Sequence, residues 1–162
     1  MKRISPAEIE ALSGAARQSP RRRANLNLHP RLDDPVQRLA IAMEPDTVVQ
    51  VHRHPQTFEL LHALRGRFVV LHFDDKGRVT GRTVLGEECA MVENPAGQWH
   101  AVLSLDPGGV IFEVKHGPYV PVSMADTAPW SVVTETETPR LLDWYAAARV
   151  GDRFSMPPRQ ES

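Results

Sequence analysis

The sequence predicts an all-β barrel or sandwich with a short helix near each end of the chain. From residue 36 to about residue 122, short runs rich in β-branched and aromatic residues alternate with turn residues. No long helical pattern interrupts these runs, which argues against a parallel α/β sheet. We therefore divide the chain into an N-terminal helix with a basic, polar arm at residues 1–35, a barrel at 36–125, and a C-terminal helix and tail at 126–162.

The N-terminal segment carries the start signals of a short helix. Ser5 suits the N-cap, Pro6 suits the first helical position, and Glu8 completes a capping box with Ser5. Apolar residues then follow at helical spacing: Ile9, Leu12 and Ala16. The stretch after the helix, RRRANLNLH, is expected to be a solvated or ligand-facing loop, because three arginines in a near-neutral chain are weak evidence for nucleic-acid binding.

Short β-rich runs fill the middle of the chain. They are VQRLAIAM, TVVQVHRH, GRFVVLHF, GRVTGRTVL, CAMVEN, QWHAVLSL and GVIFEVK. Turn residues separate them in EPD, DDKG, NPAG and DPGG. The clearest hairpin is FDDKGRV, in which Gly77 can adopt a positive φ. Strands this short are typical of an antiparallel barrel or sandwich.

The tail contains a second helix, TPRLLDWYAAARVG. Thr138 is the expected N-cap, Pro139 the first helical residue, and Gly151 the residue that ends the helix. Its apolar face, which is expected to pack on the barrel, consists of Leu141, Trp144, Tyr145 and Ala148.

Composition excludes several classes of protein. The chain has 162 residues, of which 41% are hydrophobic and 24% charged, as in an ordinary single globular domain. The formal net charge of −1 provides no general attraction to nucleic acid or to a membrane. No apolar run approaches the ~18 residues of a membrane span, and the N-terminus lacks an apolar signal core, so we expect a cytoplasmic protein. Cys89 is the single cysteine, which excludes an intrachain disulfide and a thiolate metal cage.

The segment VHRHPQTFEL brings together residues that can bind a metal. Side chains alternate along a strand, so His52 and His54 are expected on the same side of one strand. Pro55 should end that strand, and Glu59 then follows on the next strand or on a bulge. A fourth candidate, His100, follows the tight turn in ENPAGQWH.

Three histidines and one glutamate predict a site for one divalent transition metal ion. Nitrogen and oxygen ligands of this kind suit zinc, iron(II), manganese, nickel and cobalt alike. Four protein ligands leave positions free in a five- or six-coordinate shell, which disfavours a purely structural metal.

The same residues resemble the two sequence motifs of the cupin superfamily. HRHPQTFELLHALRG fits H-x-H-(x)4-E-(x)6-G, and PAGQWH fits P-x-G-x-x-H. Cupins are small jelly-roll β-barrels with a metal inside, so the resemblance implies a cupin-type (jelly-roll) β-barrel with His52, His54, Glu59 and His100 as ligands. The sequence departs from the motifs at Asp46, Cys89 and Ser104, which are turn and support positions.

A wider resemblance points to the WbuC family of cupin-fold metalloproteins. RRRANLNLH, DPVQRLAIAMEPDT, HRHPQTFEL, GRFVVLHFDDKGRV and FEVKHGPYVP carry it, over roughly residues 20–130. That family is associated with gene clusters for bacterial cell-surface polysaccharides, so the resemblance implies a sugar or nucleotide-sugar substrate. The expected assembly is a homodimer.

Other residues are candidates for catalysis and binding. Glu113 and Lys115 alternate onto one face of their strand, which means either solvent or a polar pocket. In a pocket, both are candidate catalytic groups together with Tyr119, a proton donor near the rim. The wider resemblance marks His29, Arg23 and Asn25 as candidate substrate-binding residues. His62 and His72 match no motif position and are interpreted as structural or exposed.

Two functions compete. One is a metal-dependent enzyme for a small polar substrate, in which isomerase, lyase and dioxygenase chemistry all remain open. The alternative is a non-catalytic cupin that binds a small molecule without converting it.

Overall fold

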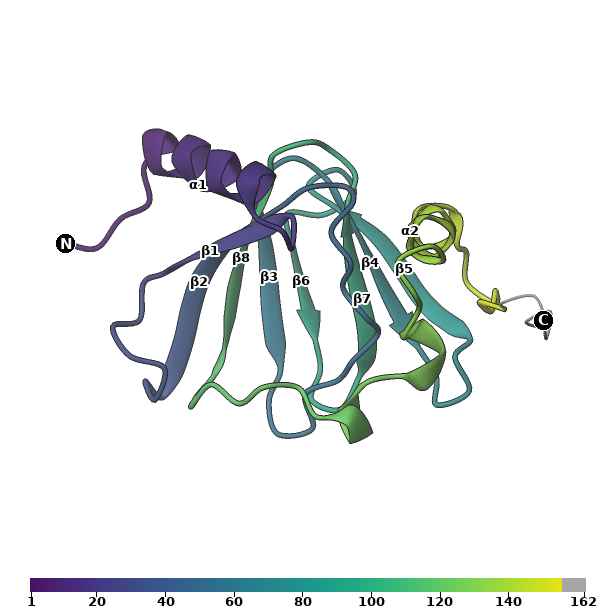
Figure 1. Cartoon of the computed structure of the whole chain (residues 1–162). Coiled ribbons are helices and arrows are strands. Elements are labelled where there is room, and N and C mark those ends of the chain that lie inside the picture. The colour runs from purple at the N-terminus through teal and green to yellow at the C-terminus, as the bar shows by residue number, and fades with distance from the viewer. Residues whose placement is uncertain (156–162) are drawn as a thin grey trace.

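The computed structural model describes residues 1–155. Its helices are α1 (Pro6–Gln18) and α2 (Thr138–Ala147), with short 3-10 helices η1 (Met124–Asp126) and η2 (Pro129–Ser131). Its strands are β1 (Arg23–Asn27), β2 (Val36–Met43), β3 (Glu59–Arg65), β4 (Phe68–Phe73), β5 (Val79–Leu85), β6 (Met91–Asn94), β7 (Trp99–Ser104) and β8 (Gly109–His116). The predicted all-β fold with a helix near each end is confirmed (Figure 1).

The strands form two antiparallel sheets. One has five strands in the order β1-β2-β8-β3-β6, and the other has three in the order β5-β4-β7. Figure 1 shows α1 across one end of the larger sheet and α2 beside the smaller one. Segment 44–58 connects β2 to β3 within the larger sheet, and segment 117–137 connects β8 to α2.

Side-chain alternation divides the apolar residues into three clusters. One lies between the sheets and includes Met43, Phe68 and Ile111. A second lies between α1 and the outer face of the larger sheet, where Ala40 is fully buried. The third packs α2 on the outer face of the smaller sheet, with Tyr145 fully buried. Met43 and Ile111 of the first cluster also line a cavity between the sheets.

The helix signals are confirmed at α1 and only partly at α2. Ser5 and Glu8 form the predicted capping box. Helix α2 begins at Thr138 and takes Glu137 as its N-cap, one residue earlier than predicted. It ends at Ala147, and Gly151 lies beyond it in a turn with φ of 99°. Neither helix is long and apolar enough to cross a membrane in the part of the chain that the structure describes.

Two segments differ from the sequence-based prediction. The basic arm contains a strand, since residues 23–27 form β1 at the edge of the larger sheet. The run at residues 47–54 is extended but is not a strand, and His52 makes only isolated bridges. Its backbone donors bond to separate parts of the chain, such as Ser131 Oγ at 3.0 Å and the His100 carbonyl at 3.0 Å. A single continuous ladder therefore cannot form there. Residues 156–162 of the predicted tail lie outside the described residues.

Candidate metal centre

Four side chains converge between the two sheets. One ligand atom from each of His52, His54, Glu59 and His100 lies within 4.8 Å of the others. The ring centroid of His52 is 5.0 Å from that of His54 and 4.5 Å from that of His100. The predicted constellation is thus assembled in one place.

Three different parts of the chain hold these residues. His52 and His54 belong to the extended segment after β2, Glu59 begins β3, and His100 lies in β7. The His52 and His100 backbones exchange two hydrogen bonds, of 3.0 and 2.8 Å, which fix this segment on the smaller sheet. The Pro55–Gln56 turn then reverses the chain into the larger sheet, so the cluster joins both sheets.

Backbone carbonyls orient two of the imidazoles. His52 Nδ1 lies 2.9 Å from the Gln50 carbonyl oxygen, and His100 Nδ1 lies 2.8 Å from that of Gln98. A carbonyl only accepts, so both Nδ1 atoms carry the hydrogen, and in neutral imidazoles the Nε2 lone pairs are free to bind a cation.

The cluster has the polar atoms that a cation would satisfy. His54 Nε2 and His100 Nε2 are buried without a hydrogen-bond partner. They lie 3.3 and 3.1 Å from the Glu59 carboxylate oxygens. Lone pairs that face a carboxylate at this distance need a proton or a metal ion between them. These donor types therefore fit a divalent transition metal.

The pKa values of the clustered residues depend on two opposing effects, which are burial and the charges of neighbouring groups. Burial lowers the pKa of His52 to about 4. Burial also acts on His100, but its contact with Glu59 outweighs that effect and raises the pKa of His100. For Glu59, burial is opposed by His100, His54 and Lys115, which together hold its pKa well below the ordinary value. The carboxylate is therefore ionised and available as a ligand.

Asn94 and His72 support the cluster, and the sequence analysis missed this role. The Asn94 amide donates to Glu59 Oε2 at 3.0 Å, and its carbonyl oxygen lies 2.7 Å from His72 Nε2. Asn94 is 1% exposed, in the register position opposite Glu59. The only sequence signal was its place directly before the P-x-G turn, and His72 was interpreted as structural or exposed.

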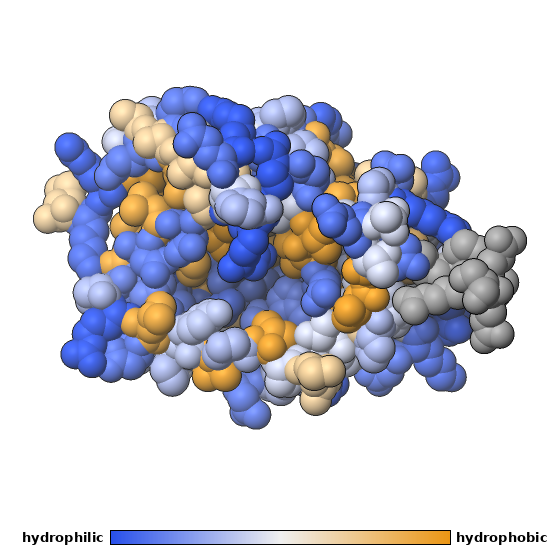
Figure 2. All heavy atoms as spheres, viewed as in Figure 1, coloured by the Kyte–Doolittle hydropathy of each residue, from blue (hydrophilic) through white to orange (hydrophobic). Residues whose placement is uncertain are grey.

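The cluster opens onto a cavity of about 470 Å³. Figure 2 shows the hollow in this face of the molecule, with hydrophilic and hydrophobic residues around it. The predicted catalytic and substrate-binding residues all line it with His52, His54 and Glu59: Arg23, Asn25, His29, Glu113, Lys115 and Tyr119. Their roles remain predictions, but the structure brings all six to one cavity.

Glu113 and Lys115 face the cavity and not bulk solvent. Lys115 Nζ lies 2.7 Å from Glu113 Oε1 and 3.6 Å from Glu59 Oε1. Burial and the charge of Glu59 raise the pKa of Glu113 to about 7, although Lys115 opposes the shift. Tyr119 is half-exposed on the segment after β8, at the edge of the cavity.

Comparison of the sequence with family models assigns the chain to a family. The model described as "Domain of unknown function (DUF6016)" matches residues 4–85, half of the chain. The chain belongs to the DUF6016 family. In this DUF6016 protein the match extends from α1 to β5 and contains His52, His54 and Glu59. None of the curated proteins compared with the sequence matches it.

Several solved structures are similar to this DUF6016 protein. Oxalate oxidase in complex with the substrate analogue glycolate has 15% identity and a TM-score of 0.51, over 81% of this chain and 76% of that chain. The TT1209 protein from Thermus thermophilus has 20% identity and a TM-score of 0.51, over 67% and 92%. A cupin superfamily protein from Desulfitobacterium hafniense has 19% identity and a TM-score of 0.46, over 58% and 76%.

At these identities the structural similarities concern the fold alone. The DUF6016 protein has the all-β, cupin-type fold that the two motifs predicted. The narrower resemblance to the WbuC family remains a prediction from the sequence.

Proposed function

We propose that this DUF6016 protein binds one divalent transition metal ion and is a metal-dependent enzyme for a small polar substrate. One observation carries the proposal: ligand atoms of three histidines and a glutamate lie within 4.8 Å of one another, beside a cavity of about 470 Å³. A cavity of this size matches those that hold small molecules.

The position of the cluster favours a functional metal over a structural one. His52, His54 and Glu59 line the cavity, so a substrate can reach the ion that they hold with His100. When bound, such an ion would polarise a carbonyl or hydroxyl oxygen of the substrate. Zinc, iron(II), manganese and nickel all suit these ligands.

Groups of the chain itself can hold and move protons beside the cluster. The Glu113 carboxylate and the Lys115 ammonium are in hydrogen-bond contact on the cavity wall. Either can exchange a proton with a substrate bound between them and the cluster. Tyr119, at the cavity edge, is the proposed donor on the solvent side.

The finer parts of the proposal are expectations from the sequence, and the family resemblance implies only the class of substrate among them. They are a sugar or nucleotide-sugar substrate linked to surface polysaccharide synthesis, isomerase, lyase or dioxygenase chemistry, a homodimer and a cytoplasmic location. The alternative, a protein that binds a small molecule without turnover, has the same fold and cluster and differs only in the outcome of an activity assay.

Elemental analysis and a turnover assay test the proposal together. Protein purified without added metal should contain about one transition metal ion per chain. The His52→Ala/His100→Ala variant should contain almost none, while His62→Ala, a histidine outside the cluster and the cavity, should match the wild type. Turnover in a panel of sugar phosphates that is lost in the double variant would support the enzyme, and binding without turnover would support the alternative. Absence of metal from the wild-type protein would contradict both the metal-dependent enzyme and the non-catalytic metal-binding alternative.

A further inference from the structure

Strand β1 turns a polar face to the cavity. Ala24 and Leu26 pack under α1, so the alternate residues Arg23, Asn25 and Asn27 point the other way and line the cavity. This edge strand lies three strands away from Glu59 in the sheet. It therefore forms a wall of the cavity that the metal cluster does not use.

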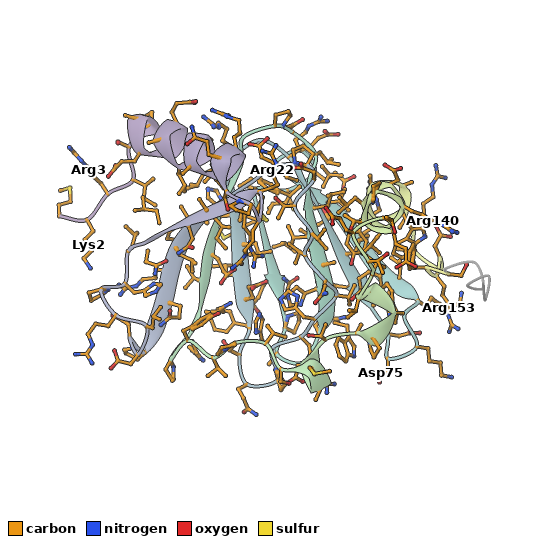
Figure 3. All side chains as sticks on the ribbon, viewed as in Figure 1. Lys2, Arg3, Arg22, Asp75, Arg140 and Arg153 are labelled. Atoms are coloured by element: carbon orange, nitrogen blue, oxygen red, sulfur yellow. The ribbon has the colours of Figure 1, made fainter. Side chains whose placement is uncertain are left out.

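Arg23 has a positive charge without a carboxylate partner. Its side chain makes no hydrogen bond or ion pair with any residue in the described part of the chain. Its neighbour Arg22, at the junction of α1 and β1 in Figure 3, differs because it binds Asp46 at 2.9 Å. Glu113, an acid on the cavity wall, is already paired with Lys115 at 2.7 Å.

Arg23 is partly buried and lines the cavity. Burial and the nearby Arg21 lower the pKa of Arg23, while Tyr119 and Glu113 oppose the shift. Tyr119 and Glu113 line the same cavity, so Arg23 contributes a positive charge to a space that it shares with both residues.

His29 offers an unpaired polar atom beyond the far end of β1. It is 4% exposed and lines the cavity. His29 Nδ1 lies 2.9 Å from the Arg38 backbone nitrogen and 3.0 Å from the Arg38 carbonyl oxygen, so the Arg38 backbone satisfies Nδ1 in either tautomer. In both cases Nε2 is buried without a partner. A hydroxyl group of a ligand, which can donate or accept, would satisfy it.

Asn25 and Asn27 suit hydroxyl groups. Asn25 Nδ2 donates to Asn27 Oδ1 at 2.8 Å, which leaves the Asn25 oxygen and the Asn27 amide nitrogen for other partners. One accepts and the other donates, and a hydroxyl group does both.

We propose that the cavity binds a hydroxylated organic anion, whose carboxylate or phosphate group is held by Arg23 and one of whose hydroxyl groups forms a hydrogen bond with His29 Nε2. This inference rests on the proposed function, because it names the class of its substrate. The anionic group lies on the β1 wall, and the rest of the ligand extends towards the metal cluster.

Calorimetric titration of the purified protein tests the inference with three probes that share one skeleton. D-glucuronate carries a carboxylate at C6, D-glucose 6-phosphate a phosphate on the C6 oxygen, and D-glucose no charge. One charged probe should bind at least about tenfold more tightly than glucose, because charge-assisted hydrogen bonds to Arg23 add affinity. The charged probe that binds more tightly shows whether the cavity prefers a carboxylate or a phosphate group.

Two variants assign the contacts, and a third is a matched control. Arg23→Gln should weaken binding of the preferred charged probe by about ten- to a hundredfold and leave glucose unaffected. His29→Asn keeps a polar group that can bond to the Arg38 backbone but loses Nε2, and should weaken binding of the preferred charged probe by about two- to tenfold. Arg31→Gln is the control, because Arg31 pairs with Asp33 and does not line the cavity. It removes the same charge and should leave the affinity for the charged probe unchanged.

Metal content measured on the same samples separates the two proposals. Charged probes that bind no more tightly than glucose, or equal effects of Arg23→Gln and Arg31→Gln, would overturn this inference even if one metal ion per chain is present. Absence of metal would overturn the proposed function, while the preference for an anion and its loss in Arg23→Gln would still support the β1 subsite.

Discussion

At the residue scale, Asn94 connects two parts of the candidate metal centre. Its amide nitrogen donates to Glu59 Oε2, so its oxygen must accept the hydrogen on His72 Nε2. This chain of two hydrogen bonds holds the Glu59 carboxylate at Oε2, the oxygen that also lies 3.1 Å from His100 Nε2. Residues that orient metal ligands in this way affect metal affinity although they do not touch the ion.

We expect Asn94→Ala to weaken metal affinity by about ten- to a hundredfold, because Glu59 loses the donor that orients it. Competition with a chelator of known affinity measures the change. Asn25→Ala, which also removes a side-chain amide but lies on β1, should leave metal affinity unchanged. Equal affinities of Asn94→Ala and the wild type would show that Glu59 is held without Asn94.

Metal occupancy should decrease as the pH falls, because protons and the metal compete for the same imidazole nitrogens. His100 gains a proton first, since contact with Glu59 raises its pKa despite burial, whereas His52 stays neutral until about pH 4. Elemental analysis after dialysis at a series of pH values should show occupancy falling below about pH 6.5. Constant occupancy down to strongly acidic pH would contradict histidine ligation.

At the scale of elements, hydrophobic patterns predicted most strands but not their partners. The alternation in VQRLAIAM corresponds to β2 at Val36–Met43. The short strand β1 was not predicted, because RANLN has only two apolar residues, which pack under α1. Its other side chains line the cavity and are polar. Segment 47–54 has the composition of a strand, but its hydrogen-bond partners are distant in sequence, and a local pattern cannot reveal them.

The site was more predictable than the network around it. Two motifs with fixed spacing predicted the four clustered residues, because residue type and chain separation are properties of the sequence. The partners of Asn94 and His29 depend on which strands lie side by side, so only the structure reveals them.

Two glycines at turns allow a comparison of backbone strain and packing. Gly77 and Gly97 have φ of 74° and 78°, where an L-residue costs about 1–2 kcal/mol. A Cβ on Gly77 would lie 2.9 Å from Trp130 Nε1, whereas one on Gly97 meets nothing within 4 Å. Gly97→Ala should therefore reduce the free energy of unfolding by the strain alone, and Gly77→Ala by more. Denaturant titration measures both, and equal costs would show that Trp130 moves aside freely.

At the scale of the whole molecule, three apolar clusters pack the sheets and helices together. They lie between the sheets, under α1 and under α2. We expect these clusters to keep the chain folded when the ion is removed, although with lower stability.

Removal of the metal with a chelator should lower the melting temperature without unfolding the protein at 25 °C. An ion that binds only the folded state at a hundred times its Kd adds about 2.7 kcal/mol to the free energy of unfolding. Thermal denaturation followed by far-ultraviolet circular dichroism measures the shift, with the His52→Ala/His100→Ala variant as control. A chelator effect of the same size in that variant would place the stabilising ion elsewhere.

We expect His52, His54, Glu59 and His100 to hold one metal ion at the wall of the cavity. A crystal structure with anomalous diffraction recorded at the absorption edge of the metal found by elemental analysis tests this most directly. A single anomalous peak should lie about 2.0–2.2 Å from the three Nε2 atoms and a Glu59 oxygen. A peak at any other set of residues, or no peak in protein that contains the metal, would contradict this ligand set.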